Sequence, residues 1–225
     1  MPKNSMSDWE ALLSSAAHLQ KIVPDAVLVG GTAAATYAHH RVSFDHDHTL
    51  NDLKTKFDEI LEKLESIAGW KTARVRRPVL ILGSLDGIET GIRQLIRNAP
   101  LETQKVEING EYITVPTKAE MLRIKAILIL KRNSTRDYLD FVALANGLSD
   151  DGIKKALSIF DELYPQPNGE SPLMQLGKQL ANPLPFDLDD TNLAEYKNLI
   201  EEYRDWNRVN ELCQHISVDI IQAML

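Results

Sequence analysis

The sequence predicts an α+β fold in which a mixed sheet with helices is followed by a helical C-terminal half. Short apolar runs alternate with helical patterns up to about residue 115. The pair Gly30-Gly31 stops the first of these runs at the start of a helix, and after Pro116 only patterns of helical spacing follow. We therefore expect an α/β core in residues 1–116, a helical domain in residues 117–225, and a cleft between them.

The first half contains both kinds of element. Apolar or alternating runs predict strands at Ala26–Val29, Val42–His48, Trp70–Val75 and Val79–Leu82. Apolar residues at helical spacing predict helices at residues 8–21, Thr32–His39, Asn51–Ile67 (with Asn51 as N-cap) and Gly87–Arg97. Lys105–Ile108 and Tyr112–Val115 flank Asn109-Gly110, which predicts a hairpin with a type I′ turn.

The second half begins with two helix-start signals. Thr117-x-x-Glu120 is a capping box, in which each side chain satisfies an orphan backbone donor, and its helix is expected to run to about Arg132. Ser134-x-x-Asp137 resembles a second capping box, and its helix is expected to end near Asn146. Further helices are expected at residues 150–164 and Thr191–Leu225.

Composition narrows the class of protein. The 225 residues are 44% hydrophobic and 25% charged, which is typical of a folded domain. Cys213 is the single cysteine, so no intramolecular disulfide forms, and a reducing cytoplasm is the expected location. The N-terminus has no signal-peptide pattern, and no apolar stretch is long enough to span a bilayer. We expect no membrane association.

Charge bears on nucleic-acid partners. The formal net charge is −7, so a nucleic-acid substrate would need a local basic patch. One basic group is Lys71, Arg74, Arg76 and Arg77, and a second is Lys118, Arg123, Lys125, Lys131, Arg132 and Arg136. Each group, taken alone, is interpreted as a solvated face.

The chemistry of the first half centres on two short motifs. Gly30 and Gly31 let the backbone approach a phosphate at a helix start, and Thr32 adds a hydroxyl donor. Asp45 and Asp47 lie two residues apart on a strand, so they project to one side and can share Mg²⁺ ions. This order, from strand to Gly-Gly-Thr, helix and Asp-x-Asp, is typical of phosphoryl or nucleotidyl transfer.

Four of the six histidines lie close to these aspartates in the sequence: His39, His40, His46 and His48. His46 and His48 share the strand face opposite to the aspartates. A core or interface position is favoured for them over transition-metal ligation.

Two charged residues stand out in the second half. Lys125 lies between Met121 and Leu128 on an apolar stripe, so its ammonium either snorkels to water or reaches into the cleft to hold phosphate. Asp140 lies one turn beyond Arg136, so a surface ion pair is its alternative role. The residues alone leave both choices open.

A family resemblance extends these motifs. The stretch LVGGTAAATYAHHRVSFDHDHTL resembles the first motif of the nucleotidyltransferase superfamily. Together with RIKAILILKRNSTRDYLDF it resembles the AbiEii/AbiGii-type toxins of toxin–antitoxin and phage-abortive systems. The resemblance covers about residues 25–146 and implies a polymerase-β-like fold, an NTP donor and Mg²⁺ held by Asp45 and Asp47. It implies that Lys125 contacts phosphate and that Asp140 is a catalytic carboxylate or base, supported by Arg132, Arg136 and Asp137.

One feature departs from the superfamily, whose members often carry a third carboxylate on a later strand. Val79–Leu82 carries none, and the sequence does not choose among Asp86, Glu89 and Glu107. One Mg²⁺ would suffice in that case.

The resulting expectation is an NTP- and Mg²⁺-dependent nucleotidyltransferase, acting as a toxin on RNA, such as the tRNA acceptor end, or on a protein hydroxyl. A cognate antitoxin would be a further partner. The alternatives are a metal-dependent phosphohydrolase with His46 and Asp47 as ligands, and a non-catalytic module that binds a nucleotide or a partner on the same fold.

Overall fold

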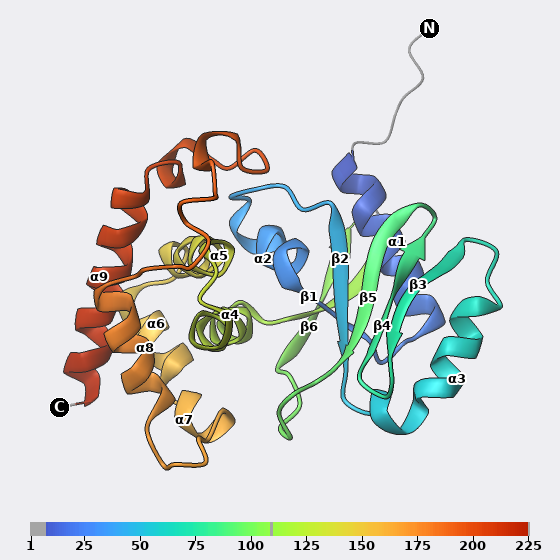
Figure 1. The fold of residues 1–225 in the computed structure, drawn as a ribbon, viewed down its shortest axis with the longest axis horizontal. Coiled ribbons are helices and arrows are strands. Elements are labelled where there is room, and N and C mark those ends of the chain that lie inside the picture. Colours follow the sequence, from blue (N-terminus) through green and yellow to red (C-terminus); the bar gives the residue numbers. More distant parts are fainter. Residues whose placement is uncertain (1–7, 109, 225) are drawn as a thin grey trace, which may run out of the picture. The chain divides into compact units, whose positions relative to one another are not determined.

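The chain forms two compact units in a computed structural model that describes residues 8–108 and 110–224 (Figure 1). One unit holds the described residues up to Ala33 together with Ser43–Thr117. The other holds Ala34–Val42 and the described chain from Lys118 onward. The sequence had assigned Ala34–Val42 to the α/β core, whereas this segment packs with the helical unit.

The first unit is built on a mixed five-stranded sheet with the strand order β1-β2-β5-β4-β3. Its strands are β1 (Val27–Val29), β2 (Asp45–Leu50), β3 (Trp70–Arg76), β4 (Leu80–Leu85) and β5 (Ile88–Gln94). β2 and β5 are parallel and the other neighbouring strands are antiparallel. The predicted hairpin forms a separate sheet from β6 (Thr103–Ile108) and β7 (Glu111–Pro116), while Asn109 of its turn lies outside the described residues.

Two helices, α1 (Asp8–Ile22) and α3 (Leu53–Glu65), cover one face of this sheet (Figure 1). Leu19 of α1 and Ile60 of α3 share one buried cluster with Ile81 and Ile92 of the sheet. Burial of these apolar side chains drives the packing of helices on sheet. The opposite face of the sheet carries the alternate residues of the strands, among them Asp45 and Asp47 of β2 and Glu89 and Arg93 of β5.

The prediction of a helix at Gly87–Arg97 is wrong, because Ile88–Gln94 within this segment form strand β5. Ile88, Thr90 and Ile92 alternate with Glu89 and Gly91, and such β-branched alternation favours a strand. β5 lies between β2 and β4, so both of its edges are hydrogen-bonded. The other predicted strands of this half are present with shifted ends, and α3 begins after Asp52 rather than after Asn51.

His46 and His48 lie on the helix-covered face of β2, as expected for core residues. Both are fully buried, and their rings meet edge to face with centroids 5.2 Å apart. His46 is hydrogen-bonded to the hydroxyls of Ser15 and Thr90, each at 2.9 Å. Burial lowers the pKa of His46 to about 4, although the charge of Asp45 opposes this shift, and burial also lowers the pKa of His48 well below its usual range.

We expect acid to destabilise the first unit through these histidines. Between about pH 6.5 and pH 4 an unfolded chain binds a proton that buried His46 does not, so the free energy of unfolding falls as the pH falls through this window. His46 alone should lower the free energy of unfolding by about 2 kcal/mol when the pH falls from about 7 to about 5. Urea denaturation at the two pH values measures this, and His46→Gln should show a smaller change. An equal change in the variant would contradict the assignment.

The second unit is helical. Its helices are α4 (Lys118–Arg132), α5 (Thr135–Asn146), α6 (Asp150–Leu157), α7 (Phe160–Leu163), α8 (Pro172–Ala181) and α9 (Trp206–Met224). α4 packs against α5, α6 and α8, and α9 packs against α8 and α5. α2 (Gly30–Ala38) begins in the first unit and ends in the second. Within the described chain, no helix has both the length and the apolar composition needed to cross a bilayer.

Two predictions for this half are corrected. Thr191–Leu225 is not helical throughout, because residues 191–205 form two short 3-10 turns, Leu193–Glu195 and Glu201–Tyr203, before α9. Ser134 makes no side-chain cap on α5. Asp187 supplies the cap instead, accepting 2.7 Å hydrogen bonds from the Thr135 N–H and from the Ser134 hydroxyl.

Candidate active site

Asp45 and Asp47 project from the face of β2 that the two helices leave uncovered. Both are half-buried, whereas the intervening His46 is fully buried on the other face. This is the alternation that a strand imposes. The Ser43 hydroxyl donates a 2.9 Å hydrogen bond to Asp45 Oδ1, which fixes one carboxylate at the start of the strand.

Two glycines make room for the Asp47 side chain. Gly30 lies at the end of β1, one residue beyond Val29, the register partner of Asp47. A Cβ on Gly30 would lie 3.5 Å from the Asp47 Cβ, and a Cβ on Gly91 of β5 would lie 3.0 Å from Asp47 Oδ1. Gly30 also has a φ of +78°, which favours glycine. The Gly-Gly turn and the acidic strand, 15 residues apart in sequence, are therefore neighbours, as predicted from their order.

A third carboxylate lies on the same face. Glu89 of β5 is the register partner of Asp45, and register partners point to the same side of a sheet. The other two candidates have partners away from the aspartates. Asp86 lies in a turn, with its Oδ2 2.9 Å from His18 Nδ1. Glu107 on β6 accepts a hydrogen bond from the Tyr112 hydroxyl. The sequence could not choose Glu89 because the helix predicted there hid its pairing with β2.

The hydroxyl of Thr32 has a partner within the protein. Thr32 is buried, and its Oγ1 donates a 2.5 Å hydrogen bond to the main-chain oxygen of Asp45. This bond ties the first turn of α2 to the start of β2. The sequence predicted that Thr32 donates to a phosphate, whereas here the hydroxyl holds Gly30 and Gly31 beside the aspartates.

A second group of charged residues lies in the helical unit, around Asp140. Its Oδ1 accepts hydrogen bonds from Arg41 Nε at 2.7 Å and from His40 Nε2 at 2.8 Å. Its Oδ2 lies 3.0 Å from Arg41 Nη2 and 2.6 Å from Lys125 Nζ. Asp140 is 0% exposed and Lys125 is 2% exposed. Burial favours the neutral acid, but the charges of Arg41 and Lys125 and the bond from His40 hold the pKa of Asp140 well below its usual range.

This geometry changes the roles expected from the resemblance. A general base needs a free lone pair and a pKa near the working pH. Asp140 has four donors on two oxygens and a lowered pKa, so we do not retain it as a base. Lys125 does not snorkel to water, because it is 2% exposed and its ammonium pairs with Asp140 at 2.6 Å. These two residues form a buried structural pair.

Of the three residues expected to support Lys125 and Asp140, Arg132 and Asp137 pair with each other, whereas Arg136 is exposed. Arg132 makes a bidentate contact with Asp137, at 3.0 and 2.7 Å, and Asp137 is 0% exposed. Asp137 is therefore an ion-pair residue rather than the capping acid of α5. Arg136 is exposed on α5 and remains open for a ligand. In the second basic group, Arg123 is buried against Glu120, so this group is not one basic surface.

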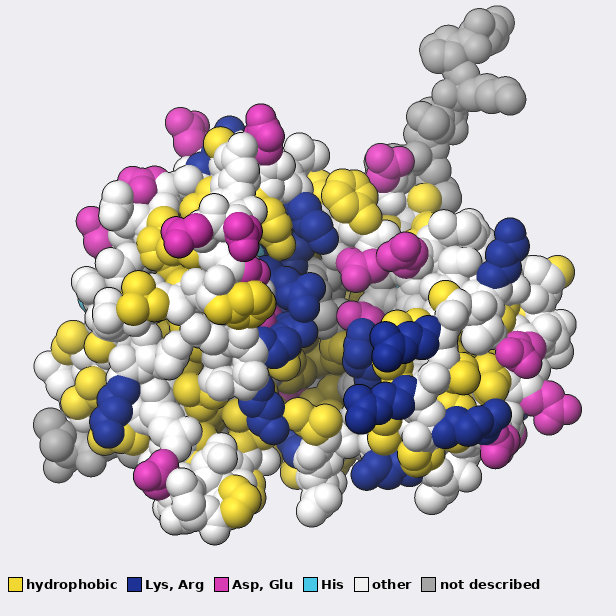
Figure 2. All heavy atoms as spheres, in the orientation of Figure 1, with side chains coloured by type: hydrophobic (Ala, Val, Ile, Leu, Met, Phe, Trp, Pro, Cys, Tyr) yellow, Lys and Arg dark blue, Asp and Glu magenta, His cyan; other side chains and the backbone are white. Residues whose placement is uncertain are grey.

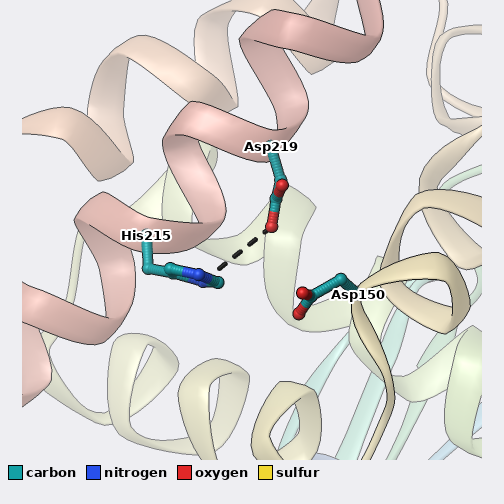
Figure 3. A group of neighbouring side chains, drawn as sticks. All are labelled: Asp150, His215 and Asp219. Carbon is teal, nitrogen blue, oxygen red and sulfur yellow. Dashed lines mark ion pairs between the residues drawn. The ribbon is translucent and has the colours of Figure 1, made fainter.

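A separate group of three side chains of the types that can bind a metal ion, Asp150, His215 and Asp219, lies on α6 and α9 (Figure 3). His215 and Asp219 extend from successive turns of α9 toward Asp150, and His215 Nδ1 lies 3.8 Å from Asp219 Oδ2 (Figure 3). The ammonium of Lys154 lies 3.3 Å from Asp219 Oδ1. Since this lysine already neutralises Asp219, we do not treat the group as a metal centre.

Comparison with solved structures identifies the fold. A Helicobacter pylori protein assigned as a nucleotidyltransferase aligns with a TM-score of 0.57 and 16% identity, over 99% of this chain and 97% of its own. JHP933 from Helicobacter pylori aligns with a TM-score of 0.55 and 15% identity, over 100% and 95%. ANT(2″)-Ia, solved in complex with adenylyl-2″-tobramycin, aligns with a TM-score of 0.51 and 10% identity, over 68% and 97%. This chain has a nucleotidyltransferase fold.

Sequence comparison leads to different proteins. No protein-family model matches the chain. The heme uptake protein MmpL11 of Mycobacterium tuberculosis is 27% identical over 237 residues, which is 96% of this chain and 23% of that protein. The mycolic acid-containing lipids exporter MmpL11 of Mycolicibacterium smegmatis is 30% identical over 129 residues, which is 56% of this chain and 13% of that protein. The chain therefore spans less than a quarter of the length of these curated relatives.

Proposed function

We propose that this protein is an Mg²⁺-dependent nucleotidyltransferase that uses an NTP as donor. The observation that carries the proposal is the group of three carboxylates, Asp45, Asp47 and Glu89, on one face of the sheet. Gly30, at the start of α2, lies directly beside one of them. Nucleotidyl transfer requires this combination of an anion-accepting backbone and clustered acids.

The donor atoms suit magnesium. Asp45, Asp47 and Glu89 offer carboxylate oxygens only, which are the ligands that a hard cation prefers. The missing side chain of Gly91 leaves space beside Asp47 Oδ1 that a Cβ would fill. Bound there, Mg²⁺ would neutralise the charge that develops on the leaving pyrophosphate.

The other residues of the site act on position and charge. The first turn of α2 begins at Gly30-Gly31 and presents backbone N–H groups to an anion. Thr32 holds this turn against Asp45. Arg93 Nε lies 3.6 Å from Asp47 Oδ1, so it orients that carboxylate and adds positive charge beside the phosphates.

The resemblance to AbiEii/AbiGii-type toxins adds a biological proposal. Under this proposal the chain is a toxin that transfers a nucleotide to RNA or to a protein hydroxyl, and a cognate antitoxin restrains the toxin. We do not favour the phosphohydrolase alternative, because His46 and Asp47 point to opposite faces of β2 and cannot bind one ion.

Glu89 should be required for transfer while Glu107 should not. Glu89→Gln removes one of the negative charges proposed to hold the metal, and we expect transfer to fall by roughly a hundredfold. Glu107→Gln makes the same chemical change on the separate hairpin and should leave the rate within about twofold. Initial rates at several Mg²⁺ concentrations measure both. Equal rates for the two variants would remove Glu89 from the metal site.

Incubation of the protein with α-labelled NTPs, Mg²⁺ and separate pools of RNA and protein tests the proposal. We expect label to enter one pool only when Mg²⁺ is present. Calorimetric NTP·Mg²⁺ binding without transfer to any pool would instead support the non-catalytic module.

A further inference from the structure

The uncovered face of the sheet carries a row of cations along its edge strand, β3. Arg74 and Arg76 are the register partners of Leu82 and Leu80 on β4. Lys71 pairs with Ser84 of the same strand. Register partners share a face, so all three cations project to the same side. We call Lys71, Arg74 and Arg76 the cationic row.

The cationic row lies on the face that holds the proposed metal site. Ser84 pairs with Glu89, and Leu82 pairs with Gly91, the register partner of Asp47. A register shift between Thr72 and Arg74 keeps Arg74 on this face, although it follows Lys71 by three residues. The acids therefore occupy the inner strands of this face and the cations occupy its edge.

Among the residues that the structure describes, these cations have no acidic partner. Lys71, Arg74 and Arg76 are exposed, and no carboxylate of the described chain lies within ion-pair distance of them. Arg77, the next residue in the sequence, behaves differently, because it pairs with Asp58 and stacks 5.1 Å from the centre of the Phe57 ring. The sequence grouped all four together as a solvated face, and the structure separates one paired arginine from three unpaired cations.

A hollow of about 770 Å³ continues the positive surface at the end of β3. Its lining includes Lys54, Arg76, Arg93 and Arg97 and contains no acidic residue. Arg76 and Arg93 flank Leu80 in one register row. In the right half of Figure 2, Lys and Arg side chains gather over the strands of this sheet. Arg93 also lies 3.6 Å from Asp47, so the hollow adjoins the proposed metal site.

We propose that the cationic row and this hollow bind the phosphodiester backbone of a nucleic acid strand, which serves as the acceptor. The acceptor role rests on the proposed nucleotidyltransferase function, whereas the binding does not. From Lys71 to Arg76 the row is about 16 Å long, which exceeds the reach of one small anion. Unpaired arginine forks suit phosphate oxygens, and a groove of positive charge follows a strand without reading its sequence.

The negative net charge of the chain supports the cationic row as the nucleic-acid surface. The whole chain carries a formal charge of −7, so it repels polyanions on average. A nucleic acid that binds this protein must therefore use a local positive surface, and the cationic row with its hollow has the required unpaired charge.

Fluorescence anisotropy with a short labelled single-stranded RNA, without NTP or Mg²⁺, tests the proposal. The variant Lys71→Gln/Arg74→Gln/Arg76→Gln is compared with the control Lys21→Gln/Lys63→Gln/Lys105→Gln, whose lysines are exposed elsewhere on the same unit. Each removes three positive charges and takes the formal charge from −7 to −10. We expect the first variant to weaken binding roughly a hundredfold at about 0.1 M salt and to flatten the plot of log K against log salt by about 2. The control should lose less than about threefold.

Each outcome decides for or against the proposal. Equal weakening in both triple variants, an unchanged salt slope, or no binding by the wild type would overturn it. If the first variant loses affinity for NTP while RNA binding is unchanged, the surface belongs to the donor triphosphate and the proposal is also overturned. Should the triple variant fail to fold, Arg74→Gln and Arg76→Gln alone are each expected to lower the slope by about 0.7. Label transfer to another acceptor with no RNA binding would reject this surface and leave the transferase proposal standing.

Discussion

Replacing Asp47 with asparagine is expected to lower nucleotidyl transfer by about a thousandfold while leaving the fold intact. Asp47 is half-buried on the uncovered face of β2, between Gly30 and Gly91, and no core packing depends on its charge. The amide has nearly the same shape but lacks the negative charge proposed to bind Mg²⁺. Loss of about 4 kcal/mol of transition-state stabilisation corresponds to this factor.

The matched control for Asp47→Asn is Asp58→Asn, which makes the same change at an exposed position of α3. It should retain at least about half of the wild-type rate, and both variants should melt within a few degrees of the wild type. Initial rates with labelled NTP measure the difference. A rate for Asp47→Asn close to that of Asp58→Asn would mean that Asp47 does not hold the metal.

The largest effect on stability is expected for Asp140→Asn. This carboxylate neutralises Arg41 and Lys125, and all three side chains are buried. Its removal takes away the 2.6 Å ion pair of Lys125, whose next carboxylate is Asp137 at 3.8 Å, and the 2.7 Å ion pair of Arg41. Breaking buried ion pairs on one side typically costs about 3–5 kcal/mol. Urea denaturation should show this loss in the free energy of unfolding. Asp189→Asn, at an exposed loop position, should change it by less than about 0.5 kcal/mol.

A double-mutant cycle separates a structural role for Asp140 from a catalytic one. If Lys125 and Asp140 stabilise each other, Lys125→Gln should cost much less in the Asp140→Asn background than in the wild type, with a coupling energy above about 1 kcal/mol. A stable Asp140→Asn protein that has lost transfer would contradict this account. It would restore the carboxylate role that the resemblance to the toxin family implies.

Local patterns were sufficient for part of the site. The alternation of Asp45, His46 and Asp47 predicts which side chains share a face, because a strand has a period of two residues. The two glycines at the start of α2 predict a backbone that can approach an anion, and Gly30 adopts a positive φ. Both conclusions depend only on neighbouring residues in the chain.

Long-range pairings account for what the sequence could not predict. Glu89 joins the aspartates because β5 pairs with β2. The register of two strands whose paired residues are 44 positions apart cannot be predicted from the sequence of either strand alone. Asp140 meets Arg41 from 99 residues away, and Asp187 caps α5 from 52 residues away. A carboxylate that looked free in the sequence was thus a buried partner, and a capping box that looked complete was replaced by a residue from a loop.

Calorimetric titration of NTP into the protein tests most directly whether the acidic face of the sheet is the donor site, because it does not require the acceptor to be known. We predict binding in the presence of Mg²⁺, weakened at least about tenfold in Asp45→Asn/Asp47→Asn and unchanged in Glu107→Gln. Equal affinity of the wild type and the double aspartate variant for Mg²⁺·NTP would contradict the account.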